Sequence, residues 1–448
     1  MNIVNTIYNS SPVCMQNLMC SAKGWLIKRR RYNKNFLAEL KKYEFGVYNP
    51  DEELRKFLLQ IRHLPAYNRI LNQLEIVQKL KNGCEVKEIL SLLPIIDKNF
   101  VKEHHDNFVN TELNEAKIEM RTSGTTGSGL IFPYSVEMEN KQWAVWWRYR
   151  RRLGIDLDTW CGWFGGRQMI PMESKKAPFW RINYPGRQIM FSSFHLNSDT
   201  VKSYYDEIIE RNIKWLHGYP SNISRLAALI LDNKLKPITS VTVVTTGAEN
   251  IISNQVNLIK KAFPNAIVRQ HYGLNEGVAN ISQTKEGIWE IDKDFCYVEF
   301  IPVSEETPDI CRIIGTGFSN LAFPLVRYDT GDLAHIKVDK GRVHIISIDG
   351  RSSNVLKQPS GQDICEASLS IFLHDYNNIV EAQFYQKSID DIELRIVKGK
   401  SYDKNDENLI YKNAQKWFSE DVHFHINYVD KIERTKAGKL KLVITNIK

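Results

Sequence analysis

Short β-branched runs alternate with amphipathic stretches between about residues 116 and 350, and this alternation limits how the chain can fold. Residues 241–246 form such a run, and residues 201–210 and 253–263 have apolar side chains at helical spacing. Strands that alternate with helices usually form sheets whose faces the helices cover. The alternation therefore predicts an α/β fold with helix-covered β-sheets.

The segments before and after this region have different patterns. Residues 1 to about 115 are predicted to be mainly helical, and a turn-like break occurs at residues 349–353. We therefore predict a large N-terminal domain, residues 1–351, and a small C-terminal α+β domain, residues 352–448. Beyond a hairpin-like stretch, the tail is predicted to contain a helix near residues 367–374, a strand at 392–397 and a helix at 407–418.

Composition and charge indicate the expected location of the protein and the binding partners that are not expected. No apolar run approaches the roughly 20 residues that span a bilayer, and no basic leader precedes an apolar stretch at the N-terminus. The seven cysteines are scattered without a CxxC pair, which is typical of free thiols in a reducing compartment and predicts a cytoplasmic protein. Lys and Arg exceed Asp and Glu by 60 to 52, but they are spread along the chain, so nucleic-acid binding is not predicted. The basic residues 28–31, after the apolar stretch 24–27, leave peripheral membrane contact open.

Residues 121–129 are the stretch most informative about chemistry, and they read RTSGTTGSG. Glycines let backbone N–H groups approach a phosphate closely, and the hydroxyls of Ser123, Thr125 and Thr126 add neutral donors. No Gly-Lys-Ser/Thr ends the stretch, so it is not a Walker A loop. Taken alone, it fits either a phosphate-binding loop or a polar turn.

Three later motifs have side chains suited to a nucleotide. Residues 271–276 read HYGLNE, in which an aromatic ring can stack on a base and a carboxylate can bind Mg²⁺. Residues 327–332 read RYDTGD, and a turn carboxylate there can accept hydrogen bonds from ribose hydroxyls. Residues 435–440 read TKAGKL, where a lysine on a glycine turn can bring positive charge to a site. Each motif alone also fits an ordinary strand end, hairpin turn or basic tail.

Taken in order, these stretches resemble the signature motifs of the adenylate-forming superfamily. Residues 123–129 resemble its phosphate loop, and residues 272–276 its Tyr-Gly-x-Thr-Glu motif. Residues 328–332 resemble its Tyr-Arg-Thr-Gly-Asp motif. Gly350 and Arg351 with Gly361 resemble the hinge motif, and residues 438–439 the C-terminal lysine motif, so the resemblance covers residues 121 to 439.

Within the superfamily, the chain most resembles phenylacetate–CoA ligase-like proteins, including their CapK-type members. Residues 246–249 read TGAE, and residues 178–181, 191–196 and 217–221 read PFWR, FSSFHL and HGYPS. CapK-type members are associated with capsule and O-antigen gene sets.

The resemblance implies roles for individual residues. Lys439 and Glu276 are the implied catalytic residues: Lys439 would bridge the attacking carboxylate and the α-phosphate, and Glu276 would bind Mg²⁺. Ser353 stands at the hinge position, which implies that the small domain is mobile and rotates between two half-reactions. The residues implied to bind ATP are Ser123, Gly124, Thr125, Thr126, Gly127, Gly247, Ala248, Glu249, His271, Tyr272, Gly273, Asp332 and Arg351.

Three residues depart from the family pattern: Ser128 stands where many relatives have lysine, Asn275 replaces threonine, and Ser353 replaces Asp or Lys. Some relatives bind zinc through cysteine and histidine after the Tyr-Gly motif. Residues 281–283 and 288–290 have neither residue type, so the protein is expected to bind no zinc. The candidates for the acyl pocket are Phe194, His217 and Tyr219, with ordinary packing as an equal alternative.

The resemblance implies that ATP and Mg²⁺ activate a small carboxylic acid as its acyl-adenylate and that the acyl group then passes to coenzyme A. One alternative is an adenylate-forming amide ligase, with an amine acceptor, in capsule or O-antigen polysaccharide biosynthesis. Another alternative is a non-catalytic nucleotide-binding or scaffold protein. The sequence predicts neither the acid nor the oligomeric state.

Overall fold

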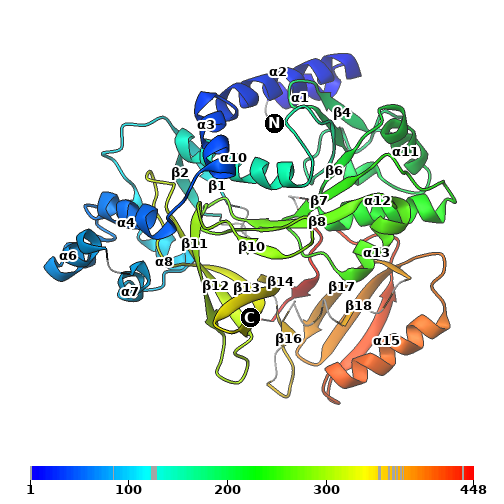
Figure 1. Ribbon diagram of the computed structural model, residues 1–448. Coiled ribbons are helices and arrows are strands. Elements are labelled where there is room, and N and C mark those ends of the chain that lie inside the picture. The colour runs from blue at the N-terminus through cyan, green and yellow to red at the C-terminus, as the bar shows by residue number, and fades with distance from the viewer. Residues whose placement is uncertain are drawn as a thin grey trace. The chain divides into compact units, whose positions relative to one another are not determined.

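The computed structural model describes residues 3–83, 85–122, 129–351, 355–361, 364–365, 369, 372–373, 376, 378–435 and 438–447. By its contacts the chain divides into two compact units. Unit 1 comprises Met1–Trp25, Leu157–Gln270 and Asp349–Lys448, and unit 2 comprises Leu26–Asp156 and His271–Ile348. The predicted α/β fold is confirmed, because both units combine β-sheets with helices (Figure 1). The domain boundary at residue 352 stays a prediction, because contacts in one conformation do not show which parts move.

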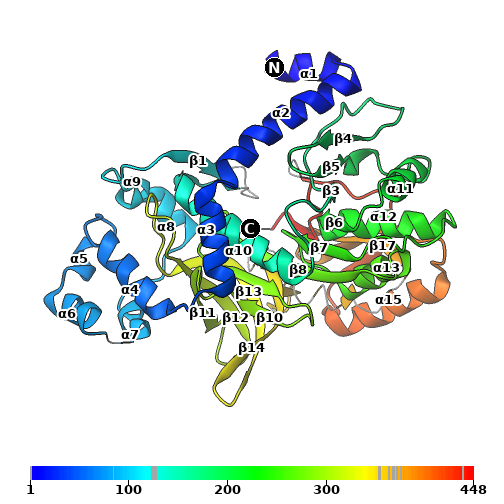
Figure 2. The same ribbon diagram turned by 45° about the horizontal axis from the view of Figure 1, so that its top comes forward.

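Helices make up most of the described chain from residue 3 to residue 108. Within unit 2, α4, α6 and α7 pack together (Figure 2). Burial of Leu54, Phe57 and Leu58 fixes one side of α4, and the Asn49 side chain caps it by accepting a hydrogen bond from the Glu52 N–H. The helices are α1 (Ile3–Ser10), α2 (Val13–Arg31), α3 (Lys34–Phe45), α4 (Pro50–Ile61), α5 (Asn68–Leu71), α6 (Leu74–Asn82), α7 (Val86–Ser91), α8 (Lys98–Glu103) and α9 (His105–Phe108).

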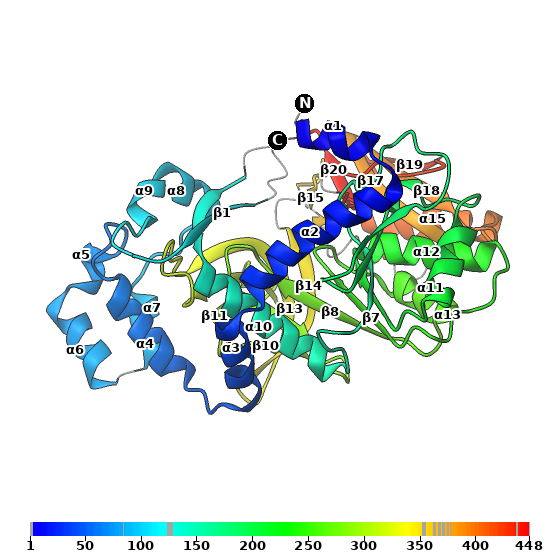
Figure 3. The ribbon, with the colours of Figure 1, turned by 90° about the horizontal axis from the view of Figure 1, so that it is seen from above.

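Helix α2, the long helix in Figure 3, carries the segment considered for membrane contact. Trp25 and Leu26 are exposed there. In unit 2, however, Arg30 and Arg31 both pair with the buried carboxylate of Glu139, at 2.6 and 2.7 Å. Two of the four clustered basic side chains are therefore engaged within the protein, and membrane contact stays a prediction. Among the described residues, no helix combines the length and apolarity that crossing a bilayer requires.

The main sheet of unit 1 is built around parallel strands. Strand β3 runs parallel to β5 and β6, and β6 runs parallel to β7. The helices that follow these strands bury Tyr204, Ile223 and Ile259 in one apolar cluster with the sheet. The strands, in sheet order, are β8 (Ile267–Gly273), β7 (Val243–Gly247), β6 (Trp215–Gly218), β3 (Cys161–Phe164), β5 (Gln188–Phe191) and β4 (Trp180–Asn183). The helices are η1 (Ser193–His195), α11 (Val201–Glu210), α12 (Pro220–Asp232) and α13 (Ser253–Ala262).

These elements confirm the helices predicted at residues 201–210 and 253–263, the second of which ends one residue early. The β-branched run at residues 241–246 forms β7, which begins two residues later than predicted.

The C-terminal segment of unit 1 forms a second sheet, whose buried face packs against Ile410 and Ala414 of a helix. The predicted strand at residues 392–397 lies within β18, and the helix predicted at 407–418 begins earlier, because Asp403 caps it. The helix predicted near 367–374 falls mostly outside the described residues. The strands, in sheet order, are β19 (His423–Tyr428), β18 (Asp391–Lys398), β17 (Ile379–Ser388) and β20 (Val443–Thr445). The helix is α15 (Lys404–Trp417), and β15 (Val355–Leu356) pairs with β16 (Ile364–Cys365).

Unit 2 contains a further sheet in which β12 runs antiparallel to both β11 and β13. Strands β1 and β2 form an antiparallel pair before α10, and β9 pairs with β10 and with the end of β8, where the unit boundary falls. These elements are β1 (Lys117–Arg121), β2 (Ile131–Ser135), α10 (Val136–Arg152), β9 (Asn280–Gln283), β10 (Trp289–Ile291), β11 (Cys296–Pro302), β12 (Ile310–Gly317), β13 (Tyr328–Asp339) and β14 (Arg342–Arg351).

Arg148, on α10, is a buried charge that organises unit 2. Its guanidinium donates hydrogen bonds to Asp292, at 2.6 Å, and to Asp294, at 2.8 Å. The second Asp292 oxygen accepts a hydrogen bond from Asn280 Nδ2 at 2.6 Å, and Asn280 Oδ1 lies 2.9 Å from His271 Nε2. A continuous set of polar contacts therefore links α10 to β9 and to the end of β8.

We predict that Arg148→Ala lowers the free energy of unfolding by about 3 kcal/mol, because it leaves two carboxylates buried without their cation. Arg152→Ala is the matched control, since half-exposed Arg152 lies 3.8 Å from half-exposed Glu290 and its loss should cost only about 0.5 kcal/mol. Urea unfolding followed by circular dichroism measures both changes. Equal, small shifts for the two variants would contradict a stabilising role for the Arg148 network.

Candidate active site

The carboxyl ends of three neighbouring parallel strands meet at one edge of the unit 1 sheet. Phe164 of β3 pairs with Gly218 of β6, and Gly218 pairs with Thr246 of β7. The next residues along the chain, including Tyr219 and Ala248, leave the sheet at this edge. Ligands of open α/β sheets commonly bind outside the carboxyl ends of the strands. The fold therefore brings together candidates that are about 30 residues apart in sequence.

Glu249 connects the first turn of α12 to the C-terminal lysine loop. One carboxylate oxygen accepts a hydrogen bond from the Ser221 N–H at 3.3 Å, and the other accepts one from the Leu440 N–H at 2.8 Å. Burial raises the pKa of Glu249, while the positive charge of Arg434 acts in the opposite direction. The preceding residue, Ala248, has φ +65°, an uncommon conformation for a residue with a side chain. Strain of this kind is concentrated at functional sites.

The C-terminal lysine loop lies against the same edge. Gly438 has φ +76°, and a Cβ there would lie 2.2 Å from Gly166 Cα, so only glycine allows this approach. The Gly438 N–H donates to the Thr435 carbonyl at 2.7 Å, which tightens the turn. Lys439 Nζ lies 5.8 Å from the centre of the Tyr219 ring. Unit 1 therefore places Lys439 beside Tyr219 and one residue from the Glu249 contact.

The candidates for the acyl pocket occupy the neighbouring loops. His217 Nδ1 lies 2.9 Å from Thr245 Oγ1 and 3.1 Å from the Thr245 carbonyl oxygen, which fixes the ring on β6. Trp215 Nε1 donates to the same hydroxyl at 2.7 Å. Phe194 lies in η1, where the adjacent Ser193 hydroxyl donates to the Gly165 carbonyl at 3.2 Å.

Two buried hydroxyls at the strand edge indicate whether a polar ligand would fit there. Thr246 Oγ1 has no hydrogen-bond partner within the described part of the chain, whereas the Ser221 side chain interacts with the Glu249 carboxylate and acts to lower its pKa. Buried polar groups are rarely left unpaired in proteins, so a ligand with oxygen or nitrogen atoms would suit Thr246. The site therefore fits a nucleotide or an acyl-adenylate, although the sequence pattern did not single out either hydroxyl.

In unit 2, the Tyr-Gly motif and the Asp motif are in direct contact. The Tyr272 hydroxyl donates to Asp332 Oδ2 at 2.8 Å. Burial, followed by the charge of Asp332, raises the pKa of Tyr272 well above its usual value. Glu276 is buried nearby, 8% exposed, and its charge adds to this effect. Carboxylate oxygens are ligands that Mg²⁺ prefers, so Glu276 fits the metal that the resemblance implies.

Asp332 is positioned by a strand irregularity rather than by the expected turn. The motif lies inside β13, where the pairing with β12 shifts between Arg312 and Ile314. Thr330 Oγ1 donates to the Ile313 carbonyl at 2.9 Å and accepts a hydrogen bond from the Asp332 N–H at 3.1 Å. Such bulges redirect side chains while the strand continues. Because the bulge has a turn-like composition, the sequence of this motif predicts a turn.

His271 is held inside unit 2. Burial lowers its pKa to about 4, although the contact with Asn280 acts in the opposite direction, so the ring is neutral near pH 7. Its ring also packs at 5.5 Å from the Trp146 ring and 5.6 Å from the Tyr149 ring. His271 therefore has a packing role, and its predicted part in ATP binding stays a prediction.

The base of the phosphate loop is described, but the loop itself is not. Thr122 closes it by exchanging hydrogen bonds with Leu130, each at 2.9 Å. Lys98 Nζ donates to Thr122 Oγ1 at 2.9 Å, a cation that sequence reasoning missed because it lies 24 residues upstream on α8. The candidates Ser123, Gly124, Thr125, Thr126, Gly127 and Ser353 lie outside the described residues, and Arg351 ends β14.

Comparisons with known proteins show the family and the fold of the chain. The CapK C-terminal domain family matches residues 356–446. Two solved structures share the fold: 2-hydroxyisobutyryl-CoA ligase in complex with 2-HIB-AMP, and anthranilate CoA ligase AuaEII in complex with anthranoyl-AMP. The first has a TM-score of 0.63 and 16% identity, and covers 93% of this chain and 91% of that one. The second has a TM-score of 0.52 and 11% identity, with 88% and 80% covered.

The fold is thus that of the adenylate-forming CoA ligases. Protein CapK of Staphylococcus aureus is 30% identical to the chain, and the alignment covers 100% of both proteins. Full-length similarity at this level, together with the C-terminal match, shows that the chain belongs to the CapK family.

Proposed function

We propose that the chain is an AMP-forming ligase that activates a small carboxylic acid as its acyl-adenylate. The observation that carries this proposal is the position of Lys439 beside Tyr219 at the carboxyl edge of the unit 1 sheet. Gly438 packs against Gly166, and the Leu440 N–H binds Glu249, so contacts on both sides hold the lysine in place. An exposed lysine in a basic tail would need none of these contacts.

Lys439 is suited to the first half-reaction. An oxygen of the acid attacks the α-phosphate of ATP, and pyrophosphate leaves. Negative charge builds on the phosphate oxygens as this bond forms, and a positioned ammonium group stabilises it more than bulk water does. Lys439 therefore orients the carboxylate and neutralises the developing charge. The hydroxyl of Thr246 supplies a neutral partner at the same edge.

Residues of unit 2 take the other nucleotide roles that the resemblance implies. Tyr272 provides a ring for the base, and Asp332, which the Tyr272 hydroxyl orients, accepts hydrogen bonds from ribose. Mg²⁺, held by Glu276, would neutralise phosphate charge. Lys98, which contacts Thr122 next to the phosphate loop in sequence, is proposed to supply a cation, since Ser128 replaces the usual lysine.

The second half-reaction requires the Glu249–Leu440 contact to break. Glu249 precedes residue 352 and Leu440 follows it, so rotation of residues 352–448 about Ser353 separates the two. The Glu249–Leu440 hydrogen bond itself contributes about 1.5–3 kcal/mol. Rotation would also break the contacts of Arg225 with Glu381 and of Asn254 with the Ile379 carbonyl. We propose that the arrangement in which Leu440 contacts Glu249 serves adenylation.

Coenzyme A is the proposed acceptor, and its thiol would attack the acyl carbon and release AMP. An amine acceptor in capsule polysaccharide biosynthesis is the second candidate, and membership of the CapK family favours it.

Phe194, His217 and Tyr219 are proposed to line the acyl pocket. A cytoplasmic location stays a prediction from the scattered cysteines.

We predict that Lys439→Ala lowers the rate of pyrophosphate release at least about 100-fold, because a charge-stabilising donor is lost from the transition state. Release is measured with Mg²⁺–ATP and a panel of aryl, short fatty, amino and uronic acids. Lys441→Ala, two residues further along the same segment, is the control and should keep the wild-type rate. Full activity of Lys439→Ala would refute the assigned role.

If the wild type releases no pyrophosphate with any acid, calorimetry with ATP separates the remaining possibilities. Binding of ATP would favour a non-catalytic nucleotide-binding protein or an acid outside the panel. Failure to bind ATP would refute the proposed function.

We predict that Glu249→Gln lowers kcat/KM for pyrophosphate release by roughly 10- to 100-fold. The amide retains one acceptor oxygen, but its NH₂ group faces the second backbone N–H, so a buried donor loses its partner at a cost of about 1–3 kcal/mol. Glu210→Gln, at the end of α11, is the control. Because the variant weakens the contact with Leu440, it should also increase proteolytic cleavage near residues 430–440. Unchanged kinetics and cleavage would show that the contact does not position Lys439.

A further inference from the structure

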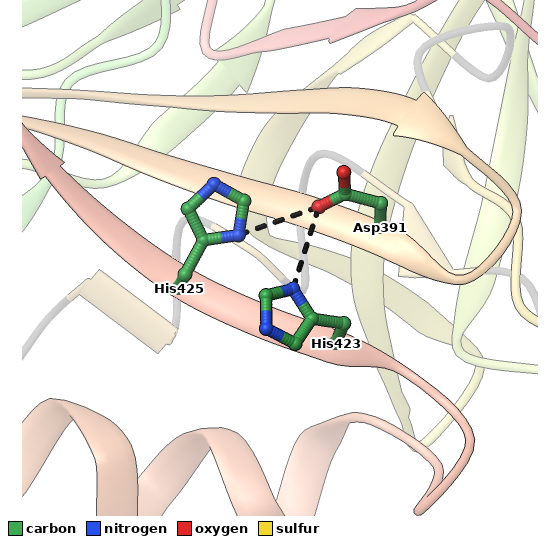
Figure 4. Close-up of side chains that lie close together, drawn as sticks. All are labelled: Asp391, His423 and His425. Carbon is green, nitrogen blue, oxygen red and sulfur yellow. Dashed lines mark ion pairs between the residues drawn. The ribbon is translucent and has the colours of Figure 1, made fainter.

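We propose that the C-terminal sheet carries a zinc site formed by Asp391, His423 and His425. These side chains come from two neighbouring strands, and their candidate ligand atoms all lie within 4.8 Å of one another. Figure 4 shows both imidazole rings directed toward the Asp391 carboxylate. The three residues precede Lys439 in sequence, and none of them is assigned to adenylation.

Strand geometry explains why these residues converge. Side chains two residues apart on a strand point to the same face, so His423 and His425 share one face of β19. Parallel pairing places Asp391 opposite His423 and Glu393 opposite His425. The other face of β18, with Ile392 and its alternate neighbours, is buried in the apolar core. The backbone therefore holds four potential ligands on one side before any metal binds.

The distances suit a tetrahedral metal. Metal–ligand bonds of about 2.0–2.2 Å at a tetrahedral angle separate ligand atoms by roughly 3.4 Å. His425 Nδ1 lies 3.3 Å from Asp391 Oδ1, and His423 Nδ1 lies 3.8 Å from the same oxygen. One of the three ligand pairs therefore already has the required separation. The second needs a few tenths of an ångström of movement, and the two histidine nitrogens, which lie within 4.8 Å of each other, must also approach; the exposed His423 side chain permits both changes.

The two closest ligand atoms of the cluster make no hydrogen bond in the described part of the chain. Asp391 Oδ1 and His425 Nδ1 are both buried, and neither makes a hydrogen bond within the described residues. Unpaired buried polar atoms are uncommon, and here two of them face each other across a gap that a metal ion would bridge. An ordinary ion pair would need a protonated imidazole, whereas a metal binds the neutral ring.

Glu393 completes the surroundings of the site. Its Oε2 lies 3.9 Å from His425 Nε2, the ring nitrogen that would not bind the metal. Metal-bound histidines commonly direct their second nitrogen to a carboxylate, which orients the ring. Arg395 Nε and Asn427 Nδ2 both donate hydrogen bonds to Glu393 Oε1 at 2.8 Å, which holds the carboxylate beside the ring.

Zinc is the metal that this ligand set favours. Two imidazoles and one carboxylate form a borderline-soft set that suits Zn²⁺, with water in the fourth position. The site joins edge strand β19 to β18, so bound zinc would hold the sheet edge in place. It differs from the zinc position that some relatives have after the Tyr-Gly motif, and it departs from the expectation, drawn from that motif region, that the protein binds no zinc.

The test uses tag-free, full-length protein that has been treated with EDTA and then titrated with Zn²⁺ alone. Isothermal titration should give one zinc per chain for the wild type. His425→Ala and Asp391→Asn should abolish this binding, and Glu393→Gln should weaken it about 10- to 100-fold. His335→Ala is the matched control, because His335 is also exposed and lies 2.7 Å from a carboxylate, that of Asp309.

X-ray absorption at the zinc edge identifies the ligands independently of affinity. The proposal predicts only nitrogen and oxygen neighbours, at about 2.0–2.2 Å, whereas zinc bound by the cysteines would show sulfur at about 2.3 Å. Added Zn²⁺ should also raise the thermal midpoint of the wild type but not of His425→Ala. Absence of zinc binding by the wild type, equal binding by His425→Ala, or sulfur ligation would overturn the proposal.

Discussion

The carboxylate of Glu249 is the interaction on which the proposed active site depends. It accepts one backbone hydrogen bond from the first turn of α12, which follows β6, and another from the C-terminal lysine loop. These two segments are more than 200 residues apart in sequence. Because both bonds end on one partly buried side chain, the position of Lys439 is coupled to the strand edge where Tyr219 lies. A ligase that changes conformation needs such a contact to be specific but weak enough to break.

In unit 2, a network of buried ion pairs and hydrogen bonds positions the site residues. The buried Arg148 holds Asp292 and Asp294, and Asp292 in turn fixes Asn280 beside His271. His271 precedes Tyr272 on the same strand, so the strand end that presents the tyrosine is anchored through its neighbour. Buried ion pairs often add little net stability, but they specify one arrangement when every charge is satisfied. Positioning, more than stability, is the expected benefit of this network.

The sequence predicts the α/β fold and several elements well, because periodicity is local. Strand β18 and helices α11 and α13 follow from spacing alone. The Asp332 motif was interpreted as a turn, since a bulge in β13 has turn-like composition. Lys98 was not predicted, because only tertiary structure brings it to Thr122, and Ser221 and Thr246 lie in motifs quoted for the resemblance but received no individual role. The Asp391–His423 pairing likewise depends on strand register, which no short motif encodes.

The most direct test follows the oxygen atoms of the acid. With an acid that supports pyrophosphate release, the carboxylate is labelled with ¹⁸O, and the products are analysed by mass spectrometry. Attack on the α-phosphate followed by cleavage of the acyl C–O bond leaves one labelled oxygen on AMP. The account predicts AMP that carries a single ¹⁸O atom. This AMP forms when the acceptor attacks the acyl carbon, or slowly when water does so. Label in inorganic phosphate, or unlabelled AMP, would contradict an acyl-adenylate intermediate.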